Sequence, residues 1–162
     1  MIRVGIGYDV HRLVAERRLV LGGIEVPSEK GLLGWSDGDV LVHAIIDALL
    51  GAAALGDIGS HFPPNDPAYE GISSIELLRR VAGMLKSHGW RIGNIDATIV
   101  AESPRLSPFF DKMRDNIAEA LAVEKSYAGI KAKTNEGLGF IGQGEGIAAC
   151  AVASLERANE TI

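Results

Sequence analysis

The sequence predicts a single α/β or α+β domain in which strands and helices alternate along the chain. Its 162 residues match the size of about one domain, and no repeat, low-complexity tract or linker divides them. Apolar residues make up 47% and charged residues 23%, which is typical of a globular protein with a sizeable core. Segments of strand composition alternate with segments of helical periodicity, and both fold classes share this order.

The first half of the chain contains strand signals followed by a clearly helical segment. Arg3–Asp9 has the composition of a strand, and 18–23 and 24–27 suggest two short strands around a glycine turn. Apolar residues recur every three or four positions over 40–52, which predicts a helix. The prolines of Pro63–Pro67 exclude regular structure there.

The second half alternates between helices and strands. Ser73 or Ser74 is expected to cap a helix that runs to His88. Strands are expected at Ile95–Ala101 and Ala128–Thr134, and a helix between them that opens at Ser107-Pro108 and ends near Val123. The last segment, Gly146–Arg157, is ambiguous, because its alanines favour a helix whereas its apolar residues also alternate.

Composition also narrows the partners and the compartment. The net charge is −5 and no cluster of Lys and Arg is present, which argues against nucleic-acid binding. No run of about 18 uncharged apolar residues exists, so no membrane span is expected. No signal peptide is expected either, because the N-terminal strand soon meets Asp9 and His11. The lone Cys150 fits a reducing cytoplasm and is expected to be a small apolar filler. Because the protein is acidic overall, binding of an anionic ligand would require positive charge placed at the site by a metal ion, helix N-termini or a few basic side chains.

Three side chains are candidate metal ligands. Asp9 and His11 lie two residues apart on the first strand, so they should project from the same face. His43 lies mid-helix, one turn from Asp39 and one turn from Asp47, and a carboxylate such as Asp47 could fix its tautomer. Two histidines and one aspartate would leave a fourth zinc position open. The alternative is a surface histidine paired with Asp47 or Asp39.

A glycine-rich segment, 133–144, follows the strand at 128–134. Gly137, Gly139 and Gly142 match G-x-G-x-x-G, but the chain is too short beyond them for a dinucleotide-binding unit. What remains is a flexible loop with a lysine, a hydroxyl and a carboxylate, which suits a phosphate with a hard divalent ion such as Mg²⁺. A glycine-rich hairpin is the alternative.

Other loop residues permit a functional and a structural interpretation. The segment 101–106 could contact a planar ring, with Arg105 on a phosphate, or could be an ordinary loop. His61 and His88 are expected at the surface or in caps. For Asp57 and Asp66, turn capping competes with function.

Several ordered motifs extend over nearly the whole chain, from Arg3 to about Leu155. They are Asp9-Val10-His11, Ser36-Asp37-Gly38-Asp39 with His43, the segment from Asp47 through Gly56-Asp57-Ile58-Gly59, Phe62-Pro63, and Lys133–Phe140. Together they resemble the 2-C-methyl-D-erythritol 2,4-cyclodiphosphate synthase family, the cyclising enzymes of the non-mevalonate isoprenoid pathway.

The resemblance implies an α+β (mixed α/β) fold, a single domain over residues 1–162 whose mixed sheet packs against helices, with the last segment a strand. It also implies a homotrimer whose sheets line a central core, with active sites between subunits. In that family zinc is bound by the matches to Asp9, His11 and His43, and a second ion, Mg²⁺ or Mn²⁺, by the match to Glu136. Transition-state stabilisation is assigned to the matches to Thr134 and Trp35, which with Glu136 are the candidate catalytic residues.

The implied reaction converts 4-diphosphocytidyl-2-C-methyl-D-erythritol 2-phosphate to the cyclic diphosphate and CMP. The segments 57–59 and 62–66 match those that hold the methylerythritol phosphate, and 101–107 with 132–136 match those that hold the cytidine diphosphate. The candidate substrate-binding residues are Asp9, Val10, His11, Trp35, Ser36, Asp57, Ile58, Gly59, Phe62, Pro63, Asp66, Ala101, Pro104, Arg105, Leu106, Ser107, Ala132, Lys133, Thr134, Asn135, Glu136, Phe140 and Gln143.

The chain departs from the family pattern at three positions. Trp35 stands where histidine is common, so backbone N–H groups near Trp35 and Ser36, or the indole N–H, would have to replace it. Pro64 replaces a common acidic residue. Gln143 stands where arginine is frequent, at a match to the inner trimer contacts that includes Phe140, which weakens the case for an isoprenoid diphosphate in the trimer core.

Two other functions are weighed against this one. A zinc phosphohydrolase would use the open coordination position for water and cleave the diphosphate. A trimeric carrier would bind isoprenoid diphosphates in its central cavity without turnover.

Overall fold

The structure is a computed structural model that describes residues 1–158, so residues 159–162 of the predicted domain lie outside the described part. A five-stranded sheet has the order β4-β1-β7-β5-β6, and β2 and β3 form a separate hairpin. The strands are β1 Ile2–Ala15, β2 Leu19–Leu21, β3 Ile24–Val26, β4 Lys30–Leu32, β5 Trp90–Val100, β6 Ala128–Lys133 and β7 Gly146–Arg157. The helices are α1 Val40–Ala53, α2 Ile58–His61, α3 Ser74–Ser87, α4 Phe110–Leu121 and α5 Gly139–Gly142, with 3-10 turns η1 Pro67–Tyr69, η2 Ser107–Phe109 and η3 Lys125–Tyr127.

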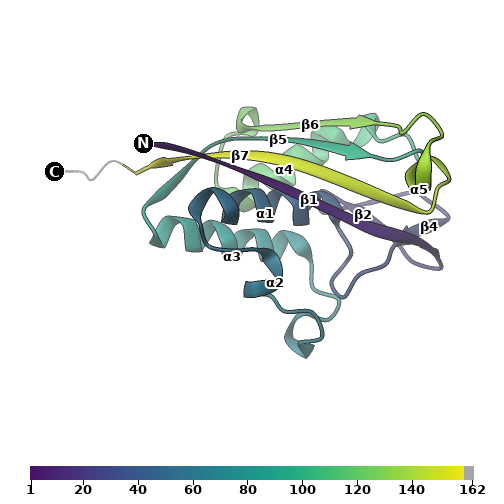
Figure 1. Ribbon diagram of the computed structural model, residues 1–162, viewed down its shortest axis with the longest axis horizontal. Coiled ribbons are helices and arrows are strands. Elements are labelled where there is room, and N and C mark those ends of the chain that lie inside the picture. The colour runs from purple at the N-terminus through teal and green to yellow at the C-terminus, as the bar shows by residue number, and fades with distance from the viewer. Residues whose placement is uncertain (159–162) are drawn as a thin grey trace.

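The sheet is mixed, because β5 and β6 are parallel whereas β1, β7 and β5 are antiparallel neighbours. Helices α1, α3 and α4 lie on one side of it (Figure 1). This confirms the predicted single-domain α+β fold with a mixed sheet packed against helices. Within residues 1–158, no helix has the length and hydrophobicity that a membrane span requires.

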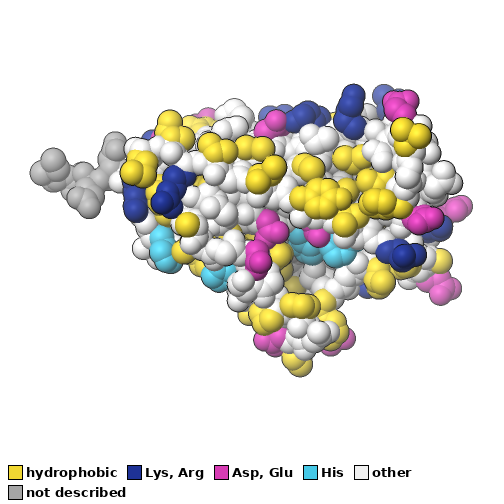
Figure 2. All heavy atoms as spheres, viewed as in Figure 1, with side chains coloured by type: hydrophobic (Ala, Val, Ile, Leu, Met, Phe, Trp, Pro, Cys, Tyr) yellow, Lys and Arg dark blue, Asp and Glu magenta, His cyan; other side chains and the backbone are white. Residues whose placement is uncertain are grey.

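The two faces of β1 differ sharply. Its odd-numbered residues face the helices, whereas its even-numbered residues lie on the open face of the sheet. Four apolar side chains are strongly exposed there: Ile2 at 69%, Val4 at 66%, Ile6 at 75% and Tyr8 at 56%. Figure 2 shows a row of hydrophobic side chains across this face of the sheet, with histidine side chains just below the row.

Two glycines allow β1 to lie unusually close to α1. A Cβ atom at Gly5 would lie 2.0 Å from the carbonyl oxygen of Ala48, and one at Gly7 would lie 1.9 Å from that of Ala44. Backbone therefore packs directly on backbone, with only small side chains on the helix. This contact brings the following odd-numbered residues of β1 next to His43, one residue before Ala44.

We expect Gly7→Ala to lower the free energy of unfolding by about 1–3 kcal/mol, because the added methyl group meets a main-chain oxygen that cannot rotate away. Denaturant unfolding measures this. Gly83→Ala is the matched control: Gly83 is exposed on α3 with no atom within 4 Å of an added Cβ, so the same change should stabilise by about 0.5–1 kcal/mol. Equal stability of the two variants would contradict the close packing.

Several elements differ from the sequence-based expectation. The first strand continues past Asp9 to Ala15, and β5 starts at Trp90 instead of Ile95. The short elements β4, α2 and α5 were not predicted. The ambiguous last segment is a strand, as the resemblance implied, because it pairs with β1 on one side and β5 on the other.

One smaller prediction was wrong, and another is confirmed only in part. Cys150 is exposed on the open face of the sheet rather than filling the core, because its strand position points away from the helices. Ser73 occupies the N-cap position of α3, but its side chain makes no capping hydrogen bond. The carboxylate of Asp37 accepts the N–H of Ser74 instead, at 2.9 Å.

Candidate metal centre and active site

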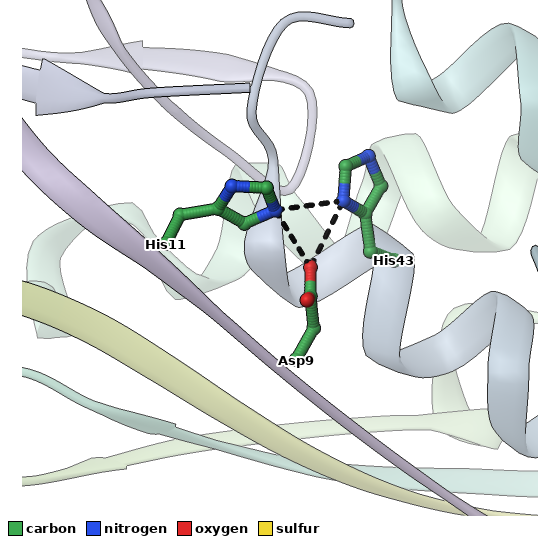
Figure 3. Close-up of side chains that lie close together, drawn as sticks. All are labelled: Asp9, His11 and His43. Carbon is green, nitrogen blue, oxygen red and sulfur yellow. Dashed lines mark hydrogen bonds and ion pairs between the residues drawn. The ribbon is translucent and has the colours of Figure 1, made fainter. Parts of the chain in front are cut away.

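Three side chains from β1 and α1 converge to form a compact cluster (Figure 3). Asp9 Oδ2 lies 2.9 Å from His11 Nε2 and 3.0 Å from His43 Nδ1. The two imidazole nitrogens lie 3.3 Å apart. The cluster confirms that Asp9 and His11 share a face of the strand and that His43 joins them.

The outward-facing nitrogens of the histidines are held by other groups. His11 Nδ1 contacts the carbonyl oxygen of Leu33, which can only accept, so this nitrogen carries a proton and Nε2 presents its lone pair to the cluster. His43 Nε2 lies 2.8 Å from Ser74 Oγ and 3.1 Å from Ser36 Oγ. The partners of His43 Nε2 are thus two serine hydroxyls. Asp47, the carboxylate that the sequence spacing suggested, is not its partner.

The charges of the cluster favour a cation. Burial raises the pKa of Asp9, but hydrogen bonds with His11 and His43 and the charges of these two side chains together hold the pKa below its ordinary value. Burial lowers the pKa of His11, but the hydrogen bond with Asp9, the charge of Asp9 and the hydrogen bond with the Leu33 carbonyl together raise it above its ordinary value. The site therefore attracts positive charge, either as protons on the imidazoles or as a metal ion.

The donor set fits zinc. One carboxylate oxygen and two imidazole nitrogens are typical ligands of catalytic zinc, which uses three protein ligands and keeps a fourth position open. All three ligand atoms lie within 4.8 Å of one another, which is close enough to share one ion. His43 is only 8% exposed, so the alternative of a surface histidine is wrong.

The two aspartates on the same helix stripe as His43 have structural roles. Asp39 is fully buried and caps α1, where its carboxylate accepts the N–H groups of Gly22, Gly23 and Val42. Burial raises the pKa of Asp39, and the nearby charge of Asp37 adds to this. Asp47 accepts the N–H of Ile58 at 2.8 Å and thereby holds the start of α2.

The cluster borders a cavity of about 240 Å³. The structure brings there Trp35, Ser36, Ile58, Gly59 and Phe62, as predicted, together with Pro64, Tyr69 and Leu77. Asp57 and Asp66 support its wall, since they cap α2 and η1. The indole N–H of Trp35 donates to the carbonyl oxygen of Asp66 at 2.9 Å, so it is already engaged.

A second cavity of about 310 Å³ is lined by most of the residues expected around cytidine diphosphate, but not by Asn135 or Glu136. Its lining residues are Ala101, Glu102, Pro104, Arg105, Leu106, Ser107, Phe110, Ala132, Lys133 and Thr134. The guanidinium Nε of Arg105 donates to Ser107 Oγ at 3.1 Å. A larger cavity of about 490 Å³, near Arg91 and Tyr127, is lined by none of the predicted site residues.

The loop after β6 is held by a carboxylate that sequence reasoning did not identify. Glu102 accepts the N–H groups of Asn135 and Gly137 at 3.1 and 3.2 Å. Glu136 lies between them with a φ of 52°, and its N–H donates to Thr134 Oγ1 at 3.2 Å. The side chain of Glu136 is exposed, its Oε1 accepts a long hydrogen bond of 3.4 Å from Thr134 Oγ1, and it has no basic partner among the described residues.

The predicted site residues are not all together in one chain. None of the residues that the structure describes lines both cavities, and the strands that carry the cavities, β1 and β6, are separated by β7 and β5. At the usual strand spacing this is about 14 Å. Phe140 and Gln143 lie at α5, outside both cavities. Ser74, Tyr69, Leu77 and Phe110 also went unidentified, because nothing local in the sequence distinguishes them from core or cap residues.

The fold and the site define a metalloenzyme candidate: an α+β domain with an Asp-His-His centre beside an open cavity. The model of the YgbB family matches residues 2–156, and curated relatives named 2-C-methyl-D-erythritol 2,4-cyclodiphosphate synthase match over their full length. The chain belongs to this family, which confirms the predicted family and enzyme class.

The relatives come in two lengths. The synthase of Alkaliphilus oremlandii is 58% identical over 97% of this chain and 100% of its own. The "Bifunctional enzyme IspD/IspF" of Desulforudis audaxviator is 61% identical over 96% of this chain, but the chain spans only 40% of that protein.

Solved structures show the same fold. The bifunctional IspDF of Campylobacter jejuni matches with a TM-score of 0.96 at 40% identity, over 100% of this chain and 44% of that one. The Plasmodium falciparum structure titled "IspF (Plasmodium falciparum) CDP complex" matches with a TM-score of 0.86 at 34% identity, over 98% of this chain and 97% of that one.

Proposed function

We propose that this protein converts 4-diphosphocytidyl-2-C-methyl-D-erythritol 2-phosphate to 2-C-methyl-D-erythritol 2,4-cyclodiphosphate and CMP. The observation that carries the proposal is the convergence of Asp9, His11 and His43 beside a cavity. The likeness to synthases over the whole chain supports the same reaction.

The reaction is an intramolecular phosphoryl transfer. An oxygen of the 2-phosphate attacks the β-phosphorus, the bond from that phosphorus to the bridging oxygen breaks, and CMP leaves with the electron pair. Because both reacting groups belong to one molecule, the protein mainly folds the substrate, and such positioning is worth roughly 7–11 kcal/mol. A phosphate oxygen is already ionised at neutral pH, so no general base is required.

The remaining obstacle is the repulsion between phosphates, about 4 kcal/mol for like unit charges 4 Å apart at an effective dielectric of 20. Zinc held by Asp9, His11 and His43, with Mg²⁺ or Mn²⁺ held by Glu136 and substrate phosphates, would supply the opposing charge. Arg105 and Lys133, at the second cavity, add positive charge there.

Three residues are assigned to the reacting phosphates. Thr134 would donate a hydrogen bond from its hydroxyl to a phosphate oxygen, in place of the long contact of 3.4 Å that this hydroxyl makes with Glu136 Oε1 in the loop held by Glu102. Trp35 would act through its backbone N–H and that of Ser36, because its indole N–H is engaged by Asp66. Glu136 would act only through the second ion.

We further propose a homotrimer with active sites between subunits. One chain holds the two cavities apart, so a neighbouring copy would join the cytidine cavity of one chain to the metal cavity of another. The apolar row on the open face of β1 offers a surface for that contact, since monomeric proteins rarely expose such contiguous patches. Phe140 and Gln143 would lie at the inner contacts; because Gln143 is neutral, any isoprenoid diphosphate in the core would bind weakly.

We expect Ile6→Asp to convert the trimer to monomers, because a carboxylate on the apolar row would be buried without a partner. Sedimentation would then give a mass near that of the 17.2 kDa chain instead of about three times that mass. Gly83→Asp, which places the same group on α3, should remain trimeric. A wild-type protein that sediments as a monomer would refute the assembly.

Phosphorus NMR of the reaction mixture tests the proposed activity. Cyclisation gives two coupled ring phosphorus signals and one equivalent of CMP. Hydrolysis, the alternative for a zinc phosphohydrolase, gives open-chain phosphates. A carrier would bind ligand without any new signal and would be indifferent to the loss of Asp9, so either of these two results would overturn the proposal.

A further inference from the structure

A buried serine links the metal cluster to a carboxylate on another segment. Ser74, the first residue of α3, is fully buried, and its Oγ lies 2.8 Å from His43 Nε2. The same hydroxyl donates to Asp37 Oδ1, and the N–H of Ser74 donates to Asp37 Oδ2 at 2.9 Å. The start of α3 therefore joins the 36–39 loop to the ligand histidine of α1.

The position of each proton in the hydrogen-bonded series Asp37–Ser74–His43 follows from its donors and acceptors. Both oxygens of Asp37 accept backbone N–H groups, Oδ1 from Asp39 and Oδ2 from Ser74. The single hydroxyl proton of Ser74 therefore lies toward Asp37 Oδ1. The oxygen of Ser74 is then an acceptor toward His43, which must donate from Nε2. A neutral imidazole with its proton on Nε2 has its lone pair on Nδ1, the atom that faces Asp9 and His11.

We propose that Asp37 and Ser74 are positioning residues that fix the tautomer and the ring orientation of His43 for metal binding. The inference rests on the proposed role of the Asp9-His11-His43 cluster as a zinc site. Carboxylate or carbonyl partners commonly hold the second nitrogen of a ligating histidine, and here a serine relays that effect. Asp47, the carboxylate that sequence spacing favoured, is engaged by Ile58 instead.

A second hydroxyl near His43 provides a matched control. Ser36 Oγ lies 3.1 Å from His43 Nε2, farther than Ser74, and its further contact is the N–H of Gly38 at 3.5 Å. Within residues 1–158, Ser36 Oγ has no carboxylate partner that would set the direction of its proton. Removing this hydroxyl should therefore disturb the tautomer of His43 much less than removing that of Ser74.

Asp37→Asn is the sharpest test, because the side chain keeps its shape while the donors and acceptors in the hydrogen bonds from residue 37 through Ser74 to His43 are expected to exchange roles. In the wild type the N–H of Ser74 donates to Asp37 Oδ2 at 2.9 Å and the N–H of Asp39 donates to Oδ1 at 3.1 Å. We expect the amide oxygen of Asn to keep the shorter of these contacts, so that the amide NH₂ group faces Ser74 Oγ and donates to it. Ser74 then turns its proton toward His43 Nε2, which becomes the acceptor. The proton of the imidazole moves to Nδ1 and blocks the atom that binds the metal.

Two measurements on the full-length chain read this out without turnover. Nitrogen-15 NMR of histidine-labelled, metal-free protein at about pH 9, above the ordinary histidine pKa of about 6.5, identifies the protonated nitrogen of His43. Competition with a chelator gives the affinity for Zn²⁺ alone. We expect protonated Nε2 in the wild type, a mixture in Ser74→Ala and protonated Nδ1 in Asp37→Asn.

The expected loss of Zn²⁺ affinity is about 10–100-fold for Ser74→Ala and Asp37→Asn, with a smaller loss for Ser36→Ala. Backbone amide spectra check that each variant is folded, and if Ser74→Ala does not fold, the Asp37→Asn tautomer decides. The wild-type tautomer and affinity in both relay variants, or an equal loss in Ser36→Ala, would overturn the inference. A wild type that binds Zn²⁺ with this tautomer yet forms no cyclic product would instead refute the proposed function alone.

Discussion

His43→Ala is expected to abolish turnover and to release most of the zinc. The variant removes one of three ligands, and the remaining Asp9 and His11 lie side by side on one strand. Two ligands from one strand cannot enclose an ion, so the affinity should fall by more than the roughly 10–100-fold that loss of an outer partner costs. Metal analysis of purified protein and the phosphorus NMR assay measure the two effects.

His88→Ala is the control for this experiment. His88 forms the C-cap of α3, outside both cavities, and its imidazole bonds only locally to Met84 and Ser87. This variant should keep both metal and activity. Normal turnover by zinc-free His43→Ala protein would remove zinc from the mechanism.

Glu136→Gln is expected to keep bound zinc and to lose activity with Mg²⁺ or Mn²⁺. The amide has the same shape as the carboxylate, so the loop held by Glu102 and Thr134 should remain in place. A neutral amide is a poor ligand for a hard divalent ion, so the second ion would no longer be retained between protein and substrate. Rates measured against Mg²⁺ concentration, with zinc content determined in parallel, separate the two metal roles.

A matched control is Glu29→Gln, which removes the charge of an exposed glutamate outside both cavities. It should leave the Mg²⁺ dependence unchanged. An ordinary response of Glu136→Gln to Mg²⁺ would contradict the assignment of the second ion to this residue.

Local sequence patterns predicted those features that depend on neighbouring residues. The alternation of a strand sufficed to place Asp9 and His11 on one face, and the apolar period of 40–52 sufficed for α1. That the two elements meet at His43 depends on the contact of Gly5 and Gly7 with the backbone of α1, which is a long-range property. No local rule reveals that a strand glycine faces a helix.

The partners of His43 show the same limit. Asp47 is one helical turn away and was the natural candidate for its hydrogen bond, yet Ser74, 31 residues away, occupies that position. The last segment, with its alanines, could be assigned only through the family resemblance, because its strand state comes from pairing with β1 and β5. The exposure of Cys150 follows from an open sheet face that sequence patterns do not identify.

We expect Asp9, His11 and His43 to bind one zinc ion beside the cavity that they border. Diffraction data recorded above and below the zinc absorption edge, from crystals soaked with CMP and Zn²⁺, test it most directly. The account predicts an anomalous peak about 2.0–2.2 Å from Asp9 Oδ2, His11 Nε2 and His43 Nδ1. A peak elsewhere, or none at these three atoms, would contradict it.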